Sequence, residues 1–182
     1  MKNVSFGRAG PFVVAIALGV ALFSCANPVQ APLDTAATPR IIYPLNKVTL
    51  WAGKTIDVGT VDRRVVDEKL VITYETREDW AIEEIHLAFS DDLADIPVNR
   101  KGNPVPGHFP TKESFSPAVT VCSFEFPCDY DPGTLLYIAA HAAVVRRDDT
   151  GRVVQRESAW ISFGKSFVEK GNWATYSIYV VR

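Results

Sequence analysis

The chain has 182 residues, with 19 Lys and Arg residues against 21 Asp and Glu residues, and its formal net charge at pH 7 is −2. A nucleic-acid-binding domain would show a basic stripe, and the near-neutral balance excludes that class of partner. The length suffices for one domain with its own hydrophobic core.

The first 24 residues are typical of an export signal. Lys2 and Arg8 form a positively charged head, and residues 11–23 are apolar throughout. A positive head, an apolar run of roughly 7–15 residues and a small residue at the cleavage point describe a signal peptide. The run is shorter than the ~20 apolar residues that a membrane-spanning helix needs. We therefore expect residues 1–24 to be removed on export.

Cys25 directly follows this apolar run. The sequence Leu22-Phe23-Ser24-Cys25 resembles the lipobox of bacterial lipoproteins, and the resemblance implies that Cys25 carries the lipid. Several acyl chains, each contributing ~0.8 kcal/mol of membrane affinity per buried CH₂, anchor a protein firmly. The resemblance therefore implies a lipid-anchored protein of the cell envelope, at the outer membrane or the cell surface. Ordinary secretion without an anchor is the alternative.

Residues 25–40 differ from the rest of the exported chain. They contain three prolines and no periodic apolar pattern. Such a composition is typical of an extended, flexible segment. We interpret residues 25–40 as a lipid-anchored tether that precedes a folded domain over residues 41–182.

Residues 41–182 carry the pattern of short strands. From Val48 onward, β-branched and aromatic residues are interrupted by turn residues, and Asp148-Asp149-Thr150-Gly151 predicts a hairpin turn. Long amphipathic helical patterns are absent from the sequence. We predict an all-β fold, an antiparallel β-sandwich of about eight strands, with a closed barrel as the main alternative. The predicted strands cover residues 47–51, 55–63, 69–76, 81–89, 119–126, 135–146, 153–163 and 173–181.

Two predicted strands carry a histidine on their less apolar face. Side chains alternate between the two sides of a strand, so Glu84 and His86 share one face of strand 81–89, together with Ile82. His141 lies on one face of strand 135–146, whose other face is wholly apolar. The apolar faces are expected to be buried. Whether the two histidines share a sheet is left open by the pattern.

Residues 90–118 interrupt the strand pattern with several prolines. Structureless loops longer than ~12–15 residues are uncommon and are often functional. Prolines favour an ordered, extended excursion over a floppy one. We expect a loop over residues 90–118 that contributes to a binding face.

Several motifs resemble a module that recurs in secreted and surface proteins of bacteria. The segment Leu50-Trp51-Ala52-Gly53-Lys54-Thr55-Ile56-Asp57-Val58-Gly59-Thr60-Val61 is similar to the opening of that module, although Lys54 stands where a glutamine is usual. The similarity extends over about residues 47–181, except around residues 122–131. It implies a secreted β-domain and no particular activity. The further matching segments are Trp80, Glu84-Ile85-His86-Leu87, Ile96-Pro97, Gly102-Asn103-Pro104-Val105-Pro106-Gly107, Phe109-Pro110, Leu136-Tyr137-Ile138-Ala139-Ala140-His141-Ala142, Glu157-Ser158-Ala159-Trp160 and Asn172-Trp173-Ala174-Thr175-Tyr176.

Cys122 and Cys128 are the two thiols that remain if Cys25 is acylated. An even pair in an oxidising compartment suggests a disulfide. Six residues of straight strand would separate the Cα atoms by ~20 Å, whereas a disulfide needs ~4.4–6.8 Å. The chain would therefore have to turn back near Phe126-Pro127. We expect this disulfide, with two unpaired cysteines as the alternative.

The residues Glu84, His86, His141 and Glu157 form the most reactive set in the sequence. Two histidines and two carboxylates could complete a tetrahedral site for a divalent metal, the one cofactor that the sequence suggests. A His–carboxylate pair could equally serve as a general base. The alternative is a polar cluster in which each imidazole bonds to a carboxylate and orders the sheet. No spacing in this set is diagnostic.

Aromatic residues are the candidates for ligand binding. Trp80, Phe109 and Trp160 could form part of an exposed face that stacks on a glycan or anchors an envelope protein. Trp80 is the best candidate for exposure because it follows the polar residues 77–79. The alternative is that these rings fill the core.

The preferred interpretation is a non-enzymatic, lipid-anchored envelope domain that binds a ligand or partner. A metal-assisted hydrolase built on His86 and His141 is the second hypothesis, and a purely structural envelope component is the third. Closely spaced imidazoles beside a cleft would favour the enzyme. A contiguous exposed aromatic patch would favour the binding protein.

Overall fold

The computed structural model describes residues 46–161 and 165–182. The predicted signal peptide, Cys25 and the predicted tether lie outside the described residues. In the described part of the chain, no helix is long and apolar enough to cross a membrane. The strands are β1 (Lys47–Ala52), β2 (Ile56–Val66), β3 (Lys69–Thr76), β4 (Trp80–Ser90), β5 (Thr111–Val119), β6 (Val121–Pro127), β7 (Leu135–Arg147), β8 (Val153–Ile161), β9 (Lys165–Ser166) and β10 (Thr175–Val180).

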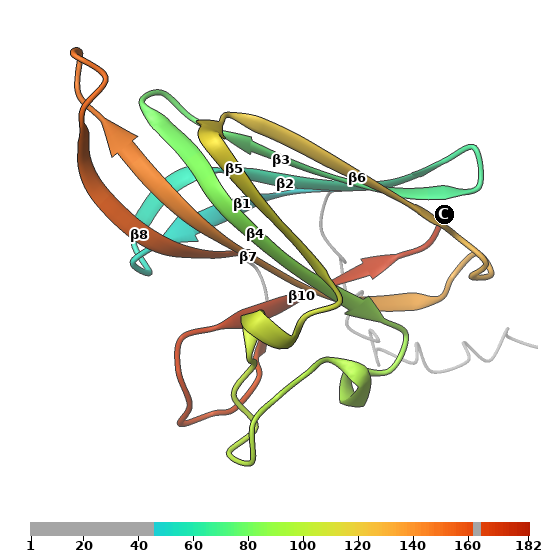
Figure 1. The fold of residues 1–182 in the computed structure, drawn as a ribbon. Coiled ribbons are helices and arrows are strands. Elements are labelled where there is room, and N and C mark those ends of the chain that lie inside the picture. The colour runs from blue at the N-terminus through green and yellow to red at the C-terminus, as the bar shows by residue number, and fades with distance from the viewer. Residues whose placement is uncertain (1–45, 162–164) are drawn as a thin grey trace, which may run out of the picture. The chain divides into compact units, whose positions relative to one another are not determined.

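The strands form one antiparallel sheet that curls so that its two halves face each other. Its order is β5-β4-β7-β8-β1-β2-β3-β6, and β10 pairs with β7. Only Thr120 separates the edge strands β5 and β6, which diverge from a shared corner along β4 and β3 (Figure 1). The all-β antiparallel class is confirmed. The sandwich-like arrangement arises from one curled sheet.

The main core lies between the two halves of this sheet. In β7, Leu136, Ile138 and Ala140 belong to the buried cluster, as their alternation predicted. Residues from β1, β2 and β3 meet them from the other half, among them Leu50 and Tyr74. Burial of such side chains contributes roughly 25 cal/mol per Å² of apolar surface, which makes this cluster the main source of stability.

A second, smaller cluster covers part of the opposite face of the sheet, which we call the outer face. Residues 91–110, here called the excursion, leave β4 and return as β5, and pack beside the segment that leads into β10 (Figure 1). The members of this outer cluster are Ala88, Ile96, Phe109, Ala139, Trp160 and Ala174.

The prediction of a loop over residues 90–118 is corrected by the structure. Two short 3-10 turns, Leu93–Asp95 and Pro106–His108, order the excursion, and residues 111–119 form β5. β5 escaped prediction because it is an edge strand with mostly exposed, polar side chains and a proline at position 117. Proline is tolerated at sheet edges, where a missing N–H interrupts no ladder.

A β-bulge in β4 corrects one predicted face. The register with β7 shifts between Ile82 and Glu84, so Ile82 lies opposite Val144 and inside the main core. The alternation had placed Ile82 with His86. An extra residue in a strand reverses the faces beyond it, which accounts for the difference.

Candidate functional site

The two histidines lie side by side on the outer face of the sheet. The register places His86 of β4 directly opposite His141 of β7, and His141 directly opposite Trp160 of β8. On the other side, Lys112 of β5 lies opposite His86. Directly paired residues point to the same side of a sheet, so these four side chains form one row. The question that the sequence left open is settled: the two histidines share a sheet.

A hydrogen-bonded chain of four side chains runs through this row. The Oε1 atom of Glu84 lies 3.2 Å from the Nε2 atom of His86. The Nδ1 atoms of His86 and His141 lie 3.2 Å apart. The Nε2 atom of His141 lies 2.8 Å from the Oγ atom of Ser158 on β8. Each imidazole nitrogen therefore has a partner, and the chain ends at an exposed hydroxyl group.

The carboxylate fixes the direction of this chain. The Glu84 carboxylate at one end of this chain only accepts hydrogen bonds. The Nε2 atom of His86 must then carry a proton, and its Nδ1 atom accepts from the Nδ1 atom of His141. This assignment leaves the Nε2 atom of His141 as an acceptor. Ser158 therefore donates its hydroxyl proton to His141.

Burial holds both imidazoles in the neutral form that this assignment needs. Burial, with a smaller contribution from the adjacent His86, lowers the pKa of His141 to about 4. The pKa of His86 is also lowered, because burial outweighs the opposing effect of Glu84, and Lys112 acts in the same direction as burial. A neutral His141 has a free lone pair available to act as a base.

The predicted metal set is not assembled. Glu157 lies opposite Val144, a core residue, and so projects from the other face of the sheet than His141. It accepts a hydrogen bond from Gln155 instead. Within residues 46–161 and 165–182, no group of three or more His, Cys, Asp or Glu side chains could hold a metal ion. Ser158 takes the place that Glu157 was expected to fill.

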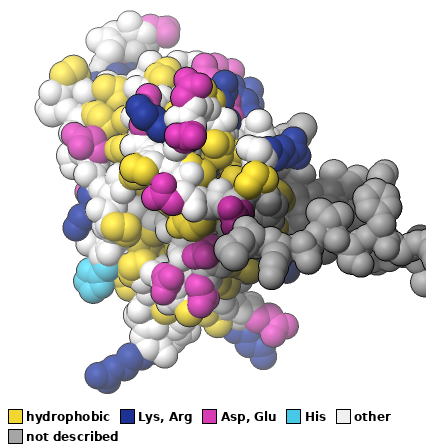
Figure 2. All heavy atoms as spheres, turned by 90° about the vertical axis from the view of Figure 1, so that its right-hand side faces the viewer, with side chains coloured by type: hydrophobic (Ala, Val, Ile, Leu, Met, Phe, Trp, Pro, Cys, Tyr) yellow, Lys and Arg dark blue, Asp and Glu magenta, His cyan; other side chains and the backbone are white. Residues whose placement is uncertain are grey.

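The predicted aromatic ligand-binding residues are buried. Phe109 and Trp160 meet edge to face in the outer cluster, with ring centroids 6.3 Å apart, and Trp80 belongs to the main core. Trp160 also packs against His141, with centroids 4.8 Å apart, and so forms an apolar wall beside the histidines. Figure 2 shows one side of the molecule, where hydrophobic side chains are scattered among charged ones. These three rings therefore form no exposed aromatic patch.

The expected Cys122–Cys128 disulfide is absent, and both thiols are free. The chain does not turn back at Phe126-Pro127, because β6 remains paired with β3 from Val121 to Pro127. An extended strand keeps residues six positions apart too distant for a disulfide. Burial raises the pKa of the Cys122 thiol, which lowers its reactivity at neutral pH.

A cavity lies among three hairpin turns at one end of the sheet. Figure 1 shows these turns in its upper left part. The cavity has a volume of about 420 Å³ and opens between the β3–β4, β5–β6 and β7–β8 turns. We call it the turn cavity. The predicted turn at residues 148–151 is confirmed by the hydrogen bond from Gly151 to Asp148. The lining residues are Glu78, Asp79, Trp80, Ala81, Ala118, Thr120, Arg147, Asp148, Asp149 and Gly151.

Asp79 is the lining residue with an unmet hydrogen-bonding requirement. Its Oδ2 atom accepts from Arg146 at 2.6 Å, and this contact holds the pKa of Asp79 below its usual range. Its Oδ1 atom is buried and has no hydrogen-bond partner in the described part of the chain. A buried acceptor without a partner costs about 1–3 kcal/mol, and the exposed part of this carboxylate is what a ligand in the cavity could reach.

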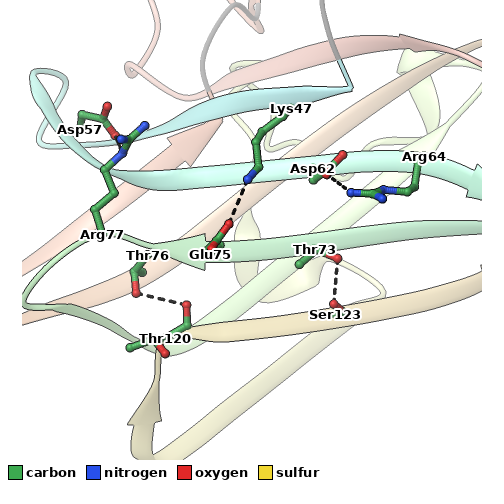
Figure 3. A network of polar contacts seen from close by, with 10 residues as sticks. All are labelled: Lys47, Asp57, Asp62, Arg64, Thr73, Glu75, Thr76, Arg77, Thr120 and Ser123. Atoms are coloured by element: carbon green, nitrogen blue, oxygen red, sulfur yellow. Dashed lines mark hydrogen bonds and ion pairs between the residues drawn. The ribbon is translucent and has the colours of Figure 1, made fainter.

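The outward face of the β1-β2-β3-β6 half carries exposed polar pairs, several of which are drawn in Figure 3. Lys47 pairs with Glu75 at 3.0 Å, and Arg77 pairs with Asp57 at 2.9 Å. The hydroxyl of Ser123 lies 2.8 Å from that of Thr73. This surface provides matched controls for Asp79 and Ser158.

Comparisons with known proteins give little further information. No family model matches the chain, and no curated protein matches it. A solved structure from Bacteroides uniformis, provisionally assigned as a carbohydrate binding protein, resembles it with 9% identity and a TM-score of 0.32. The match covers 73% of this chain and 57% of that one. A likeness this weak supports no argument about function.

Proposed function

We propose that this protein is a lipid-anchored domain of the cell envelope that binds a saccharide in the turn cavity. The anchor rests on the sequence alone, through the lipobox-like segment that ends at Cys25. The binding proposal rests on one observation: a cavity of about 420 Å³ whose lining includes the carboxylate of Asp79, a side chain that is 35% exposed. Small-molecule sites commonly have volumes of ~300–1,000 Å³.

The lining chemistry suits the hydroxyl groups of a sugar. These groups are donors, and a carboxylate such as that of Asp79 accepts from them. Asp148 is already occupied, because it accepts from Thr150 and Arg152 within its own turn. Asp79 is therefore the acceptor that a hydroxyl-rich ligand would engage.

A glycan-array screen of the full chain, followed by calorimetric titration of the best ligand, tests this proposal. Asp79→Asn should weaken binding by roughly ten- to a hundred-fold, the value of ~1.5–3 kcal/mol for a hydrogen bond to a charged group. Asp57→Asn is the matched control, because Asp57 is similarly exposed and also pairs with an arginine on the surface. Equal effects of the two substitutions, or no glycan bound at all, would contradict the proposal.

The anchor has a separate test. Cys25→Ala should move the protein from the membrane fraction to the soluble fraction, because the acyl chains supply its membrane affinity. Fractionation of cells expressing either form measures this. A variant that remains with the membranes would rule out anchoring at Cys25.

The metal-assisted hydrolase hypothesis receives no support from the side-chain positions. Its four predicted ligands lie on opposite faces of the sheet, with Glu157 separated from His86 and His141.

A further inference from the structure

Ser158 occupies an unusual position for a surface serine. It is exposed on β8, and its Oγ atom lies 2.8 Å from the Nε2 atom of His141. Behind His141 stand His86 and then Glu84, each at hydrogen-bond distance from the next. A hydroxyl that donates to a neutral imidazole, itself oriented by further partners, is the arrangement of an activated nucleophile.

We propose that Ser158 is the nucleophile of an acyl-transfer site that hydrolyses short-chain esters, with His141 as the general base and with His86 and Glu84 as positioning residues. This activity goes beyond the proposed saccharide binding and uses none of the residues that line the turn cavity. The two proposals can therefore fail independently.

The chemical steps conserve atoms and charge. The Oγ atom of Ser158 attacks the ester carbonyl carbon while its proton passes to the Nε2 atom of His141. The tetrahedral intermediate expels the alcohol, which takes that proton, and leaves an ester on Ser158. Water then attacks the acyl group and gives a proton to His141. Ser158 regains this proton as the carboxylic acid departs, so the net reaction is ester and water to acid and alcohol.

Glu84 and His86 control the direction of proton donation. If donor and acceptor were exchanged in every hydrogen bond between Glu84 and Ser158, the lone pair of His86 Nε2 would face the Glu84 carboxylate. Two acceptors would then face each other, which is unfavourable. The carboxylate therefore keeps the Nε2 atom of His141 free to accept. When His141 takes the serine proton, its Nδ1–H remains bonded to His86, which stabilises the transient imidazolium.

The surroundings favour small substrates. Ser158 lies on an open strand face, with Trp160 two residues along the same face and Phe109 behind it. Two residues before Ser158 on the same face of β8, Arg156 pairs with Glu83 at the surface. On this open face a long acyl chain would extend into solvent, so a short-chain ester is the favoured substrate.

Covalent labelling of the full chain with p-nitrophenyl acetate provides the test. Intact-mass analysis should show one added acetyl group, and peptide mapping should place it on Ser158. Ser158→Ala should reduce nitrophenol release to the background rate, and His141→Gln should slow it by ~10²–10⁴-fold, the usual contribution of a general base. Ser123→Ala is the matched control, because Ser123 is another exposed strand serine, with a threonine hydroxyl as its partner. It should leave the rate unchanged.

The pH profile separates positioning from a merely structural role. With the pKa of His141 near 4, the rate should remain constant from neutral pH down to about pH 5 and fall only near pH 4. Glu84→Gln should lower the constant rate at neutral pH and change the pH at which the rate begins to fall. Circular dichroism should show that the sheet is intact. Acetylation confined to lysines such as Lys112, or equal rates for Ser158→Ala and Ser123→Ala, would overturn the proposal.

Discussion

The two outward faces of the curled sheet have similar strand geometry but very different polar contacts. On the β1-β2-β3-β6 half, Lys47 and Glu75 are each 52% exposed (Figure 3). On the β4-β7-β8 half, His86 is only 8% exposed and belongs to a continuous chain of partners. The Lys47–Glu75 pair is separate from its neighbours and exposed to water. The second face carries a single, partly buried network.

This difference shows which face includes polar groups whose burial costs free energy. Exposed ion pairs contribute ~0–1 kcal/mol and are easily replaced. A buried polar network is favourable only when every member is satisfied, and an apolar replacement would often be as stable. The presence of one buried and one partly buried imidazole beside Ser158 therefore fits the chemical role proposed above better than a role in stability.

The largest change in stability is expected where the excursion packs on the outer face of the sheet, beside the two histidines. Phe109→Ala should destabilise the protein by about 3 kcal/mol, because Phe109 is 1% exposed and packs on Trp160. Hydrogen exchange should accelerate in residues 93–110. Phe124→Ala, which removes a ring packed on Tyr74 in the main core, is the control that should leave that segment protected. Unchanged exchange in the Phe109 variant would show that Phe109 does not hold this segment against the sheet.

A smaller effect should appear on acidification. The pKa of His141 is about 4 in the folded state and ~6.5 in an unfolded chain, so the unfolded state binds protons first. The contribution of this imidazole to stability is therefore complete above pH 6.5 and declines as the pH falls toward 4. His141→Gln should flatten this decline in melting temperatures measured between pH 7.5 and 4.5. Parallel decline in both proteins would show that another group is responsible.

The smallest change in stability is expected at the exposed Lys47–Glu75 pair. Glu75→Gln should change the free energy of unfolding by no more than about 1 kcal/mol, because both partners of the Lys47 pair are half exposed. Urea denaturation measures this, and a double-mutant cycle with Lys47→Gln isolates the pair. A loss above about 2 kcal/mol would remove the contrast between the faces.

Alternation of side chains predicted most of the fold. The apolar face of β7 and the turn at residues 148–151 appear as expected, because both depend on local chemistry. β5 and the placement of Ile82 were missed, since an exposed edge strand and a β-bulge leave no clear alternation. The rings of Trp80, Phe109 and Trp160 are buried, as in the alternative interpretation. For Trp80 the expectation of exposure failed because a polar neighbour in sequence does not decide where a large ring packs.

A one-residue shift in the pairing of β7 with β8 decides whether Glu157 or Ser158 lies beside His141. The turn pairs Asp148 with Arg152, and extrapolating this pairing along the hairpin would place Glu157 opposite Ala143, on the face of His141. A bulge between Arg146 and Arg147 shifts the register, so Ser158 lies opposite Ala143 instead. Ser158 shares a face with Trp160 by alternation, but the sequence contains no signal for the bulge. A one-residue slip reverses every side chain, which is why Ser158 was missed.

The direction of the hydrogen-bond chain is the central claim, and nitrogen NMR of the two imidazoles in the folded full chain at pH 7 tests it directly. The account predicts two neutral rings, with the proton of His141 on Nδ1 and that of His86 on Nε2, so that His141 accepts from Ser158. A proton on the Nε2 atom of His141, or a charged His141 ring, would contradict it.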